Sequence, residues 1–194
     1  MLQNTRERKS SAEGIRKQVT NGVIPFGLSL SEIIDGLKRT KAPNILEAFG
    51  FLSIKHFRKG KLLKDYGLVS CRLVTQAFTQ YLVDSLQDST TYPMDAFKYH
   101  GSGTDNTAEA NSQTALGTEV ESRQAGTQVE GATANIYKSV ATITYTASRS
   151  IVEHGLFSAA TNGTMMDRSV FTAVPVENTD TIEFTYQLTA AAET

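Results

Sequence analysis

The chain has 194 residues, 40% of them hydrophobic and 20% charged, which is the composition of a globular protein with one β domain plus an appendage, or with two very small domains. Its single cysteine, Cys71, excludes an intramolecular disulfide and a thiolate zinc site. No apolar run approaches the ~20 residues that a membrane span needs, and the N-terminus lacks the apolar core of a secretory signal, so we expect a protein made in a reducing cytoplasm.

The net charge of -1 hides an asymmetry along the chain. Residues 1–68 carry 13 Lys/Arg and 6 Asp/Glu, a net charge of +7, whereas residues 69–194 carry 6 Lys/Arg and 14 Asp/Glu, a net charge of -8. This layout suits a basic arm that lies on an acidic surface, of its own subunit or of a neighbour, and it suits equally an arm that touches nucleic acid.

Residues 1–50 are predicted to form a basic N-terminal arm with short helices. Residues 1–20 are polar and support at best a solvated helix, and an apolar linker over residues 22–27 follows. A short helix with one apolar stripe comes next, and Pro43 interrupts it before a further turn that ends at Gly50. This arm has too little apolar surface to fold alone, so we expect it to become ordered on other chains. The candidate assembly contacts are Arg16, Lys17, Ile24, Phe26, Leu30, Ile33, Ile34, Leu37, Lys38 and Arg39.

Residues 51–194 are predicted to form a β-rich domain that starts with a hairpin and a helix. Residues 51–58 alternate apolar and polar side chains, and Lys59-Gly60-Lys61 supplies a turn into residues 62–66, so we predict a β-hairpin over residues 51–66. Residues 70–87 carry apolar side chains at helical spacing, the best amphipathic pattern in the chain. The apolar face of this helix requires a sheet to cover.

From Phe97 onward the sequence is rich in Thr, Ser, Gly, Val, Ile and Tyr, the composition of short strands joined by turns. The strands predicted over residues 96–189 are 96–100, 132–146, 151–157, 165–171 and 181–188. Their short connections require antiparallel pairing. The expected fold class is mainly β (α+β): an antiparallel β-sandwich or jelly-roll-like domain with one packed amphipathic helix and a helical or extended N-terminal arm.

The stretch from Gly101 to Gly131 is rich in Gly, Thr, Ala and Asn and nearly free of large apolar residues. Compact domains rarely contain so long a loop without a purpose. Three roles stay open for it: paired polar strands, a subunit contact, or a segment that wraps a neighbour.

Histidine and cysteine are the residue types best suited to catalysis, and their contexts here argue against it. His56 lies in a basic hairpin and is predicted to be a solvated strand residue. Glu153 and His154 are adjacent on a strand, so their side chains point to opposite faces and cannot form an acid/base pair, and His154 is predicted to be buried or half-buried. Cys71 lies at the start of the predicted helix, where we expect a packed, structural thiol.

Cofactor and metal sites have little support in the sequence. The string His100-Gly-Ser-Gly-Thr104 lacks the lysine of a phosphate-binding loop. The acidic residues of the following stretch lack the spacing of a calcium loop; they are Asp105, Glu109, Glu119 and Glu121. Asp167-Arg168 is predicted to make a local or intersubunit ion pair. We therefore expect no enzyme, no cofactor, no bound metal and no small-molecule substrate.

Two other classes of function rank lower. A nucleic-acid-binding module would use the cations of residues 6–17 with the Lys38–Lys64 cluster, but no aromatic ladder accompanies them for base stacking, so a nucleic-acid partner is not expected. A carbohydrate-binding or hydrolytic appendage is marked only by Tyr137 and Tyr145, and paired carboxylates at catalytic separation are not evident.

Three strings in the C-terminal half resemble a module of virion proteins of tailed bacteriophages. Glu153-His-Gly-Leu-Phe157 resembles the E-x-G-L-F strand of that module. Its G-T-x-x-x-R hairpin is similar to Gly163-Thr-Met-Met-Asp-Arg-Ser-Val-Phe171. Its closing G-D-x-I-x-F-x-Y-x-L strand is similar to Asp180-Thr-Ile-Glu-Phe-Thr-Tyr-Gln-Leu-Thr189. Here Asn178-Thr179-Asp180 replaces the usual Gly-Asp turn. Residues 99–104 and 114–120 resemble the G-x-G-T … T-A-L-x-x-E-V segment that often precedes these strings, so the resemblance covers residues 51–190.

The resemblance implies a structural protein of a tailed-phage virion. We expect a capsid decoration or cement protein that binds and stabilises the major capsid protein shell through the N-terminal arm. Related modules are also associated with neck, head–tail connector, tail and fibre roles, which stay open as alternatives. The expected partners are the major capsid protein or other virion proteins and further copies of this chain. The expected location is the virion, after synthesis in the host cytoplasm, with no membrane contact.

Overall fold

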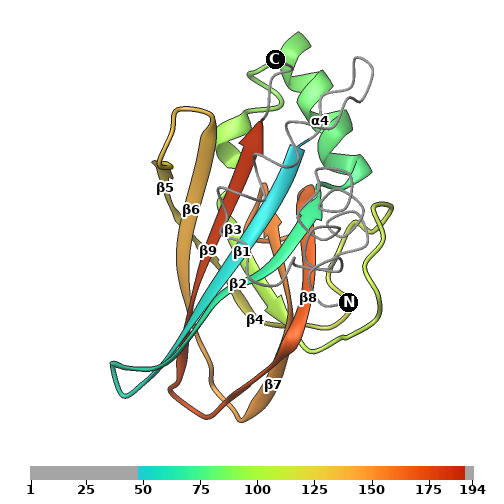
Figure 1. The fold of residues 1–194 in the computed structure, drawn as a ribbon. Coiled ribbons are helices and arrows are strands. Elements are labelled where there is room, and N and C mark those ends of the chain that lie inside the picture. The colour runs from blue at the N-terminus through green and yellow to red at the C-terminus, as the bar shows by residue number, and fades with distance from the viewer. Residues whose placement is uncertain (1–47, 191–194) are drawn as a thin grey trace, which may run out of the picture.

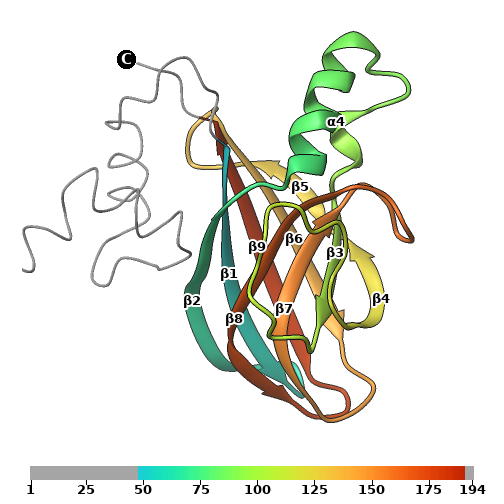
Figure 2. The same ribbon diagram turned by 90° about the vertical axis from the view of Figure 1, so that its right-hand side faces the viewer.

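The computed structural model describes residues 48–190, which fold into two antiparallel β-sheets packed face to face, with one short helix at an end of the sandwich (Figure 1). One sheet has five strands in the order β2-β1-β9-β6-β5, and the other has four in the order β4-β3-β7-β8. Figure 2 shows the two layers edge-on, with α4 above them. The predicted antiparallel β-sandwich is confirmed.

The sequence pattern located most strands and misplaced several ends. The elements are β1 (Ala48–Arg58), β2 (Lys61–Leu73), α4 (Gln76–Gln87), the 3-10 turn η1 (Met94–Ala96), β3 (Tyr99–Gly103), β4 (Glu119–Ala125), β5 (Thr127–Glu130), β6 (Ile136–Thr144), β7 (Arg149–Phe157), β8 (Met165–Val176) and β9 (Thr181–Ala190). The strands predicted over 151–157, 165–171 and 181–188 are confirmed, and each is longer in the structure.

The predicted hairpin exists and extends beyond residues 51–66. Lys59 and Gly60 both have positive φ, 51° and 73°, which is the two-residue turn whose twist matches a right-handed strand pair. Pairing with β1 continues along β2 as far as Leu73, opposite Phe49. Ala48, Phe49 and Gly50 also pair with β9. The helical turn predicted to end at Gly50 is therefore wrong for these three residues, because two neighbouring strands fix their backbone.

The predicted helix over residues 70–87 begins six residues late, at Gln76. Residues 70–73 remain in β2 because the ladder with β1 satisfies their backbone groups. Thr75 then caps the helix: its hydroxyl accepts a hydrogen bond from the Phe78 amide at 3.1 Å and donates to the Met165 carbonyl at 2.5 Å. Cys71 consequently lies on a strand and not at a helix start.

Two further predicted strands also begin late. The strand predicted over 96–100 starts at Tyr99, because residues 94–96 form η1 and Phe97 packs its ring edge-on against Phe78, with centroids 5.1 Å apart. The strand predicted over 132–146 starts at Ile136, after a turn in which the Gly131 amide donates to the Ile136 carbonyl at 2.7 Å.

The long polar stretch 101–131 forms paired strands at its end, which was one of the three roles considered. β4 belongs to the four-stranded sheet and β5 to the five-stranded sheet, so the chain changes sheet at Gly126. A Cβ at Gly126 would lie 2.4 Å from the Ser139 hydroxyl and 2.8 Å from His100 Nε2. Only glycine therefore allows the backbone to pass this close to the buried side chains.

The core lies between the sheets and divides into two main parts. The larger part holds the inward-facing aliphatic residues of five strands, with Leu52, Ile143, Ile151, Val174 and Ile182 at 0% exposure. The second part lies at the α4 end, where Phe78 and Phe97 pack on strand residues. The predicted apolar face of the helix thus covers one end of the sandwich and not the face of a sheet.

Candidate assembly surfaces

The ten assembly contacts predicted between Arg16 and Arg39 lie outside residues 48–190. The role of the arm in assembly therefore stays a prediction. The described residues include the histidines, the cysteine, the polar loop and the charged hairpin.

His56 was predicted to be solvated, and this prediction is wrong. Strand alternation turns it inward with Leu52 and Ile54, and it is 2% exposed. Its Nε2 lies 2.9 Å from Asp180 Oδ2, an acceptor that comes from a turn 124 residues later in the chain. Arg58 also reaches Asp180, with Nη2 to Oδ2 at 2.8 Å. The hydrogen bond from Arg58 holds the pKa of Asp180 well below its usual range.

His100 and His154 form a buried pair in the core. His100 Nδ1 lies 3.0 Å from His154 Nε2, and His100 Nε2 lies 2.8 Å from the Ser139 hydroxyl. Burial lowers the pKa of His100 to about 3 and the pKa of His154 well below 6.5. Both rings are therefore neutral near pH 7, and their role is to satisfy one another inside the sandwich. The predicted burial of His154 is confirmed.

Cys71 is a buried thiol on β2. Burial raises its pKa well above the usual range for cysteine, so the thiolate required of a nucleophile does not form near neutral pH. The prediction of a packed, structural cysteine is confirmed, although the element that carries it is a strand.

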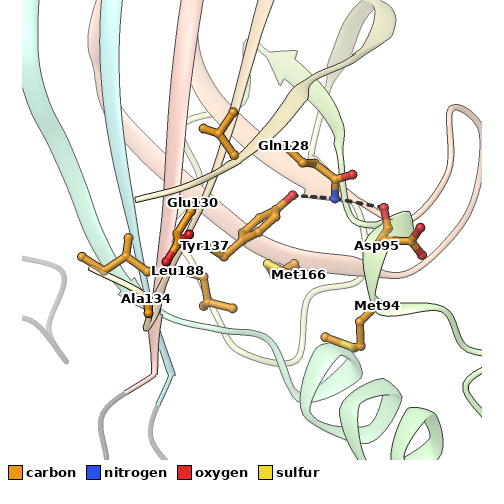
Figure 3. A pocket seen from close by; sticks show the side chains of 10 residues that line it. Met94, Asp95, Gln128, Glu130, Ala134, Tyr137, Met166 and Leu188 are labelled. Atoms are coloured by element: carbon orange, nitrogen blue, oxygen red, sulfur yellow. Dashed lines mark hydrogen bonds between the residues drawn. The ribbon is translucent and has the colours of Figure 1, made fainter. Parts of the chain in front are cut away.

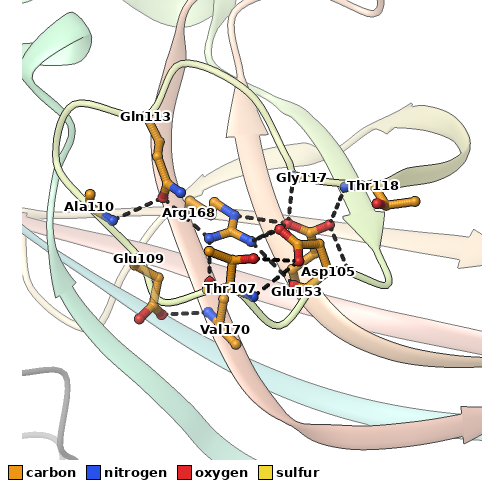
Figure 4. Close-up of polar contacts among 10 residues, drawn as sticks. All are labelled: Asp105, Thr107, Glu109, Ala110, Gln113, Gly117, Thr118, Glu153, Arg168 and Val170. Carbon is orange, nitrogen blue, oxygen red and sulfur yellow. Dashed lines mark hydrogen bonds and ion pairs between the residues drawn. The ribbon is translucent and has the colours of Figure 1, made fainter.

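Glu153 lies on the opposite face of β7 from His154, as alternation predicts, and it is the centre of a buried polar cluster (Figure 4). Its carboxylate accepts hydrogen bonds from three backbone amides of the loop over residues 104–118, at distances between 2.9 and 3.1 Å. It also pairs with Arg168, whose Nε lies 2.8 Å from Glu153 Oε2. The fully enclosed carboxylate thus anchors a loop that has few apolar side chains of its own.

Arg168 completes this anchor from β8. Its Nη1 donates to the Thr107 carbonyl at 2.9 Å, and its Nη2 lies 3.2 Å from a carboxylate oxygen of Asp105. The predicted ion pair at Asp167-Arg168 is therefore local, within the subunit, and only Arg168 makes it. The four acidic residues Asp105, Glu109, Glu119 and Glu121 bind arginines or backbone amides, and no group of three metal-ligating side chains occurs between residues 48 and 190.

An open groove of about 570 Å³ lies at the α4 end of the sandwich (Figure 3). We call it the end groove. Its walls are largely apolar and include Met94, Val129, Ile136, Met166 and Leu188, and the acidic residues Asp95 and Glu130 also line it. Gln128 fixes one wall, because its Nε2 lies 2.9 Å from the Asp95 carbonyl and 3.0 Å from the Tyr137 hydroxyl.

The carboxylates of the end groove have no partner of their own: within the described part of the chain, neither Asp95 nor Glu130 makes a side-chain hydrogen bond or an ion pair. Sequence reasoning missed this site. Gln128 and Asp95 are 33 residues apart in the chain, and only the sheet brings them together.

The tip of the β1–β2 hairpin, residues 59–64, has the opposite charge. Lys59, Lys61 and Lys64 are exposed there, and Leu62 and Leu63 are each 54% exposed. Lys64 Nζ lies 4.2 Å from the centre of the Tyr66 ring, whereas Lys59 and Lys61 have no carboxylate partner among residues 48–190. The sequence predicted the basic charge of this tip. The exposure of its two leucines is seen only in the structure.

Comparisons of the chain with protein families, with curated proteins and with solved structures found no match. No helix within the described residues is long and apolar enough to cross a membrane.

Proposed function

We propose that this chain is a structural protein of a tailed-phage virion, and that it decorates the capsid by binding the major capsid protein shell through its N-terminal arm. The observation that carries the proposal is the role of the residues in which the phage resemblance lies. Glu153, Arg168 and Asp180 each hold a loop or turn of the sandwich together through buried contacts. Motif residues that stabilise the fold, rather than forming a reactive centre, are expected of a structural module.

The titratable groups support the same proposal. Burial keeps His100 and His154 neutral and raises the pKa of the Cys71 thiol, and His56 is enclosed with Asp180. These groups are positioned for packing inside the sandwich. Within residues 48–190, the end groove and the hairpin tip are surfaces available to a partner, and the N-terminal arm is the further contact that we propose.

The copy number of the chain in purified particles tests the proposal. We expect hundreds of copies if the chain covers the shell, and about six to a dozen if it forms a ring at the neck or tail, because a ring closes with few subunits. Quantitative mass spectrometry against the major capsid protein measures this ratio. A particle that lacks the chain altogether would contradict a virion role.

The role of the arm is tested on particles stripped of this protein. We expect the double variant Leu30→Ser, Ile34→Ser to lose most of its binding to such particles, because both residues belong to the predicted apolar stripe. The matched control is Leu86→Ser, which removes an 83% exposed leucine from α4. Equal binding by both variants would show that the arm is not the contact.

A further inference from the structure

The hairpin tip and the end groove lie at opposite ends of the sandwich. β1 begins at the α4 end with Ala48 and ends at the hairpin tip with Arg58, and β9 returns along it, so the strand length separates the tip from the end groove. Eleven strand residues span roughly 35 Å. Figure 1 shows the hairpin tip pointing away from the body at the lower left, while α4 and the β5–β6 connection are at the top. A hairpin tip therefore cannot reach the groove of its own chain.

The charges of these two surfaces are complementary. The hairpin tip offers Lys59 and Lys61 without carboxylate partners, and the end groove offers Asp95 and Glu130, also without partners in residues 48–190. Lys138 pairs with Val129 across β5–β6, so its side chain lies on the same face of the sheet as Val129, and Glu130 lies on the other face.

The apolar side chains are complementary as well. Leu62 and Leu63 are adjacent on β2, where the pairing with β1 shifts register, and both side chains are exposed. A groove that receives the tip can cover both of them. The end groove, with apolar walls and about 570 Å³ of volume, has room for them, and Val129 on its rim is 44% exposed.

We propose that the hairpin tip of one copy docks in the end groove of the next copy, with its leucines against the apolar walls and its lysines facing the two carboxylates. This inference deepens the proposed structural role by naming a second copy of the chain as partner. The contact joins two different surfaces, so it is head-to-tail. Repetition of such a contact closes a ring when the rotation between copies allows it and otherwise extends a filament.

Charge reversal in the full-length chain tests this contact. The tip variant is Lys59→Glu, Lys61→Glu, and the groove variant is Asp95→Lys, Glu130→Lys. We expect the wild-type chain to show a mass that rises with concentration in analytical ultracentrifugation, and each variant to remain monomeric, because each brings like charges together. Added salt should weaken the wild-type association, since the paired charges are at the surface.

A mixture of the two variants gives the sharpest result. The reversed tip of one variant then meets the reversed groove of the other, and the native tip of the second meets the native groove of the first. We expect the equimolar mixture to regain the association that each variant lacks alone. Misfolding of either variant would prevent this recovery, and circular dichroism of each variant alone tells misfolding from a wrong contact.

The apolar part of the contact has its own variant and control. We expect Leu62→Ser, Leu63→Ser to shift the association to at least tenfold higher concentration, whereas Leu86→Ser on α4 leaves it unchanged. A wild-type chain that stays monomeric at every concentration would overturn the proposal, as would association that survives both charge reversals. Either result would leave the groove to another occupant, such as residues 1–47 or a small apolar molecule. The test needs no particles, so it is independent of whether the chain is found in a virion.

Discussion

Asp167 and Arg168 are neighbours on β8, yet their side chains enter two buried regions with opposite electrostatic character. Arg168 enters the cluster under the loop 104–118, where Glu153, Asp105 and a backbone carbonyl surround it. Asp167 points to the other face, and neither of its carboxylate oxygens has a hydrogen-bond partner. In one region the charge has a direct ion-pair partner. In the other, Asp167 makes no ion pair, and Arg72, whose charge acts on it, is paired with Glu109.

The surroundings of Asp167 explain why its charge is disfavoured. It lies beside Tyr186 and against Gly50, where an added Cβ would lie 2.1 Å from Asp167 Oδ2 and 2.3 Å from the Tyr186 hydroxyl oxygen. Burial, with a smaller contribution from the nearby Glu109 charge, raises the pKa of Asp167 to about 7. Enclosure by itself therefore does not decide whether a charge is tolerated. The partners inside the enclosure decide it.

The largest effect is expected from breaking the satisfied region. We expect Arg168→Met to destabilise the fold by about 3–5 kcal/mol, because it leaves the Glu153 carboxylate buried without its cation. Chemical denaturation measures this loss, and limited proteolysis should detect opening of the loop 104–118. The control is Arg149→Met, whose partially exposed side chain lies 3.7 Å from Glu121 and should cost at most about 1 kcal/mol. Equal losses in the two variants would refute the anchoring role.

The stability that the buried Asp167 contributes should decrease as the pH rises. The pKa of Asp167 is about 7 in the folded chain, against about 3.9 for an unfolded aspartate, so its contribution to stability falls as pH rises from about 4 to about 7 and is constant above that. We therefore expect Asp167→Asn to raise the free energy of unfolding at pH 8 by up to about 4 kcal/mol and to change little at pH 4. A difference between the two proteins that does not vary with pH would contradict the raised pKa.

Asp180 provides the opposite pH dependence in a satisfied environment. Its pKa is lowered, chiefly by Arg58, so the stability it contributes is present above about pH 4 and is lost as pH falls below that value. We expect Asp180→Asn to cost about 1–3 kcal/mol at pH 7, because His56 and Arg58 lose a charged acceptor, and to cost less as the pH approaches 2. Denaturation curves across this range measure the trend. A cost that grows on acidification would be inconsistent with it.

The smallest effect is expected from a neutral pair in the core. Tyr145 donates a buried hydrogen bond of 3.0 Å to the Ser102 hydroxyl. We expect Tyr145→Phe to cost about 1 kcal/mol at any pH between 4 and 8, because only an uncharged hydrogen bond is removed. Thermal unfolding measures the loss. A cost comparable with that of Arg168→Met would mean that charge is not what separates the buried regions.

Much of the fold was predictable because it depends on local patterns. Strand-forming composition located β7 and β8, period-two alternation marked β9, and Lys59-Gly60 identified the hairpin turn, whose positive φ angles the structure confirms. Residues 70–73 show the limit of this reasoning. They belong to a run of apolar side chains at helical spacing, but pairing with β1 keeps them in a strand. A local pattern does not show such a pairing partner.

The candidate sites were less predictable, and the charged ends show why. The lysines of the hairpin tip lie close together in the chain, so the sequence shows them as a basic cluster. The end groove is lined by residues of η1, β5, β6, β8 and β9, so no local sequence pattern predicts it. His56 was misjudged for the same reason, since its acceptor Asp180 lies at the far end of the chain.

The amino-acid pattern alone specifies a mainly β, antiparallel fold, a basic hairpin tip and the opposite directions of Glu153 and His154, because strand alternation and turn geometry act over a few residues. Which buried charges are paired is visible only in three dimensions: Arg168 contacts Glu153 and Thr107, whereas the Asp167 carboxylate lies beside the Tyr186 hydroxyl without a hydrogen bond. The physical reason is that electrostatic interactions inside a protein depend on distances in space, and the residues that set those distances come from strands far apart in the chain.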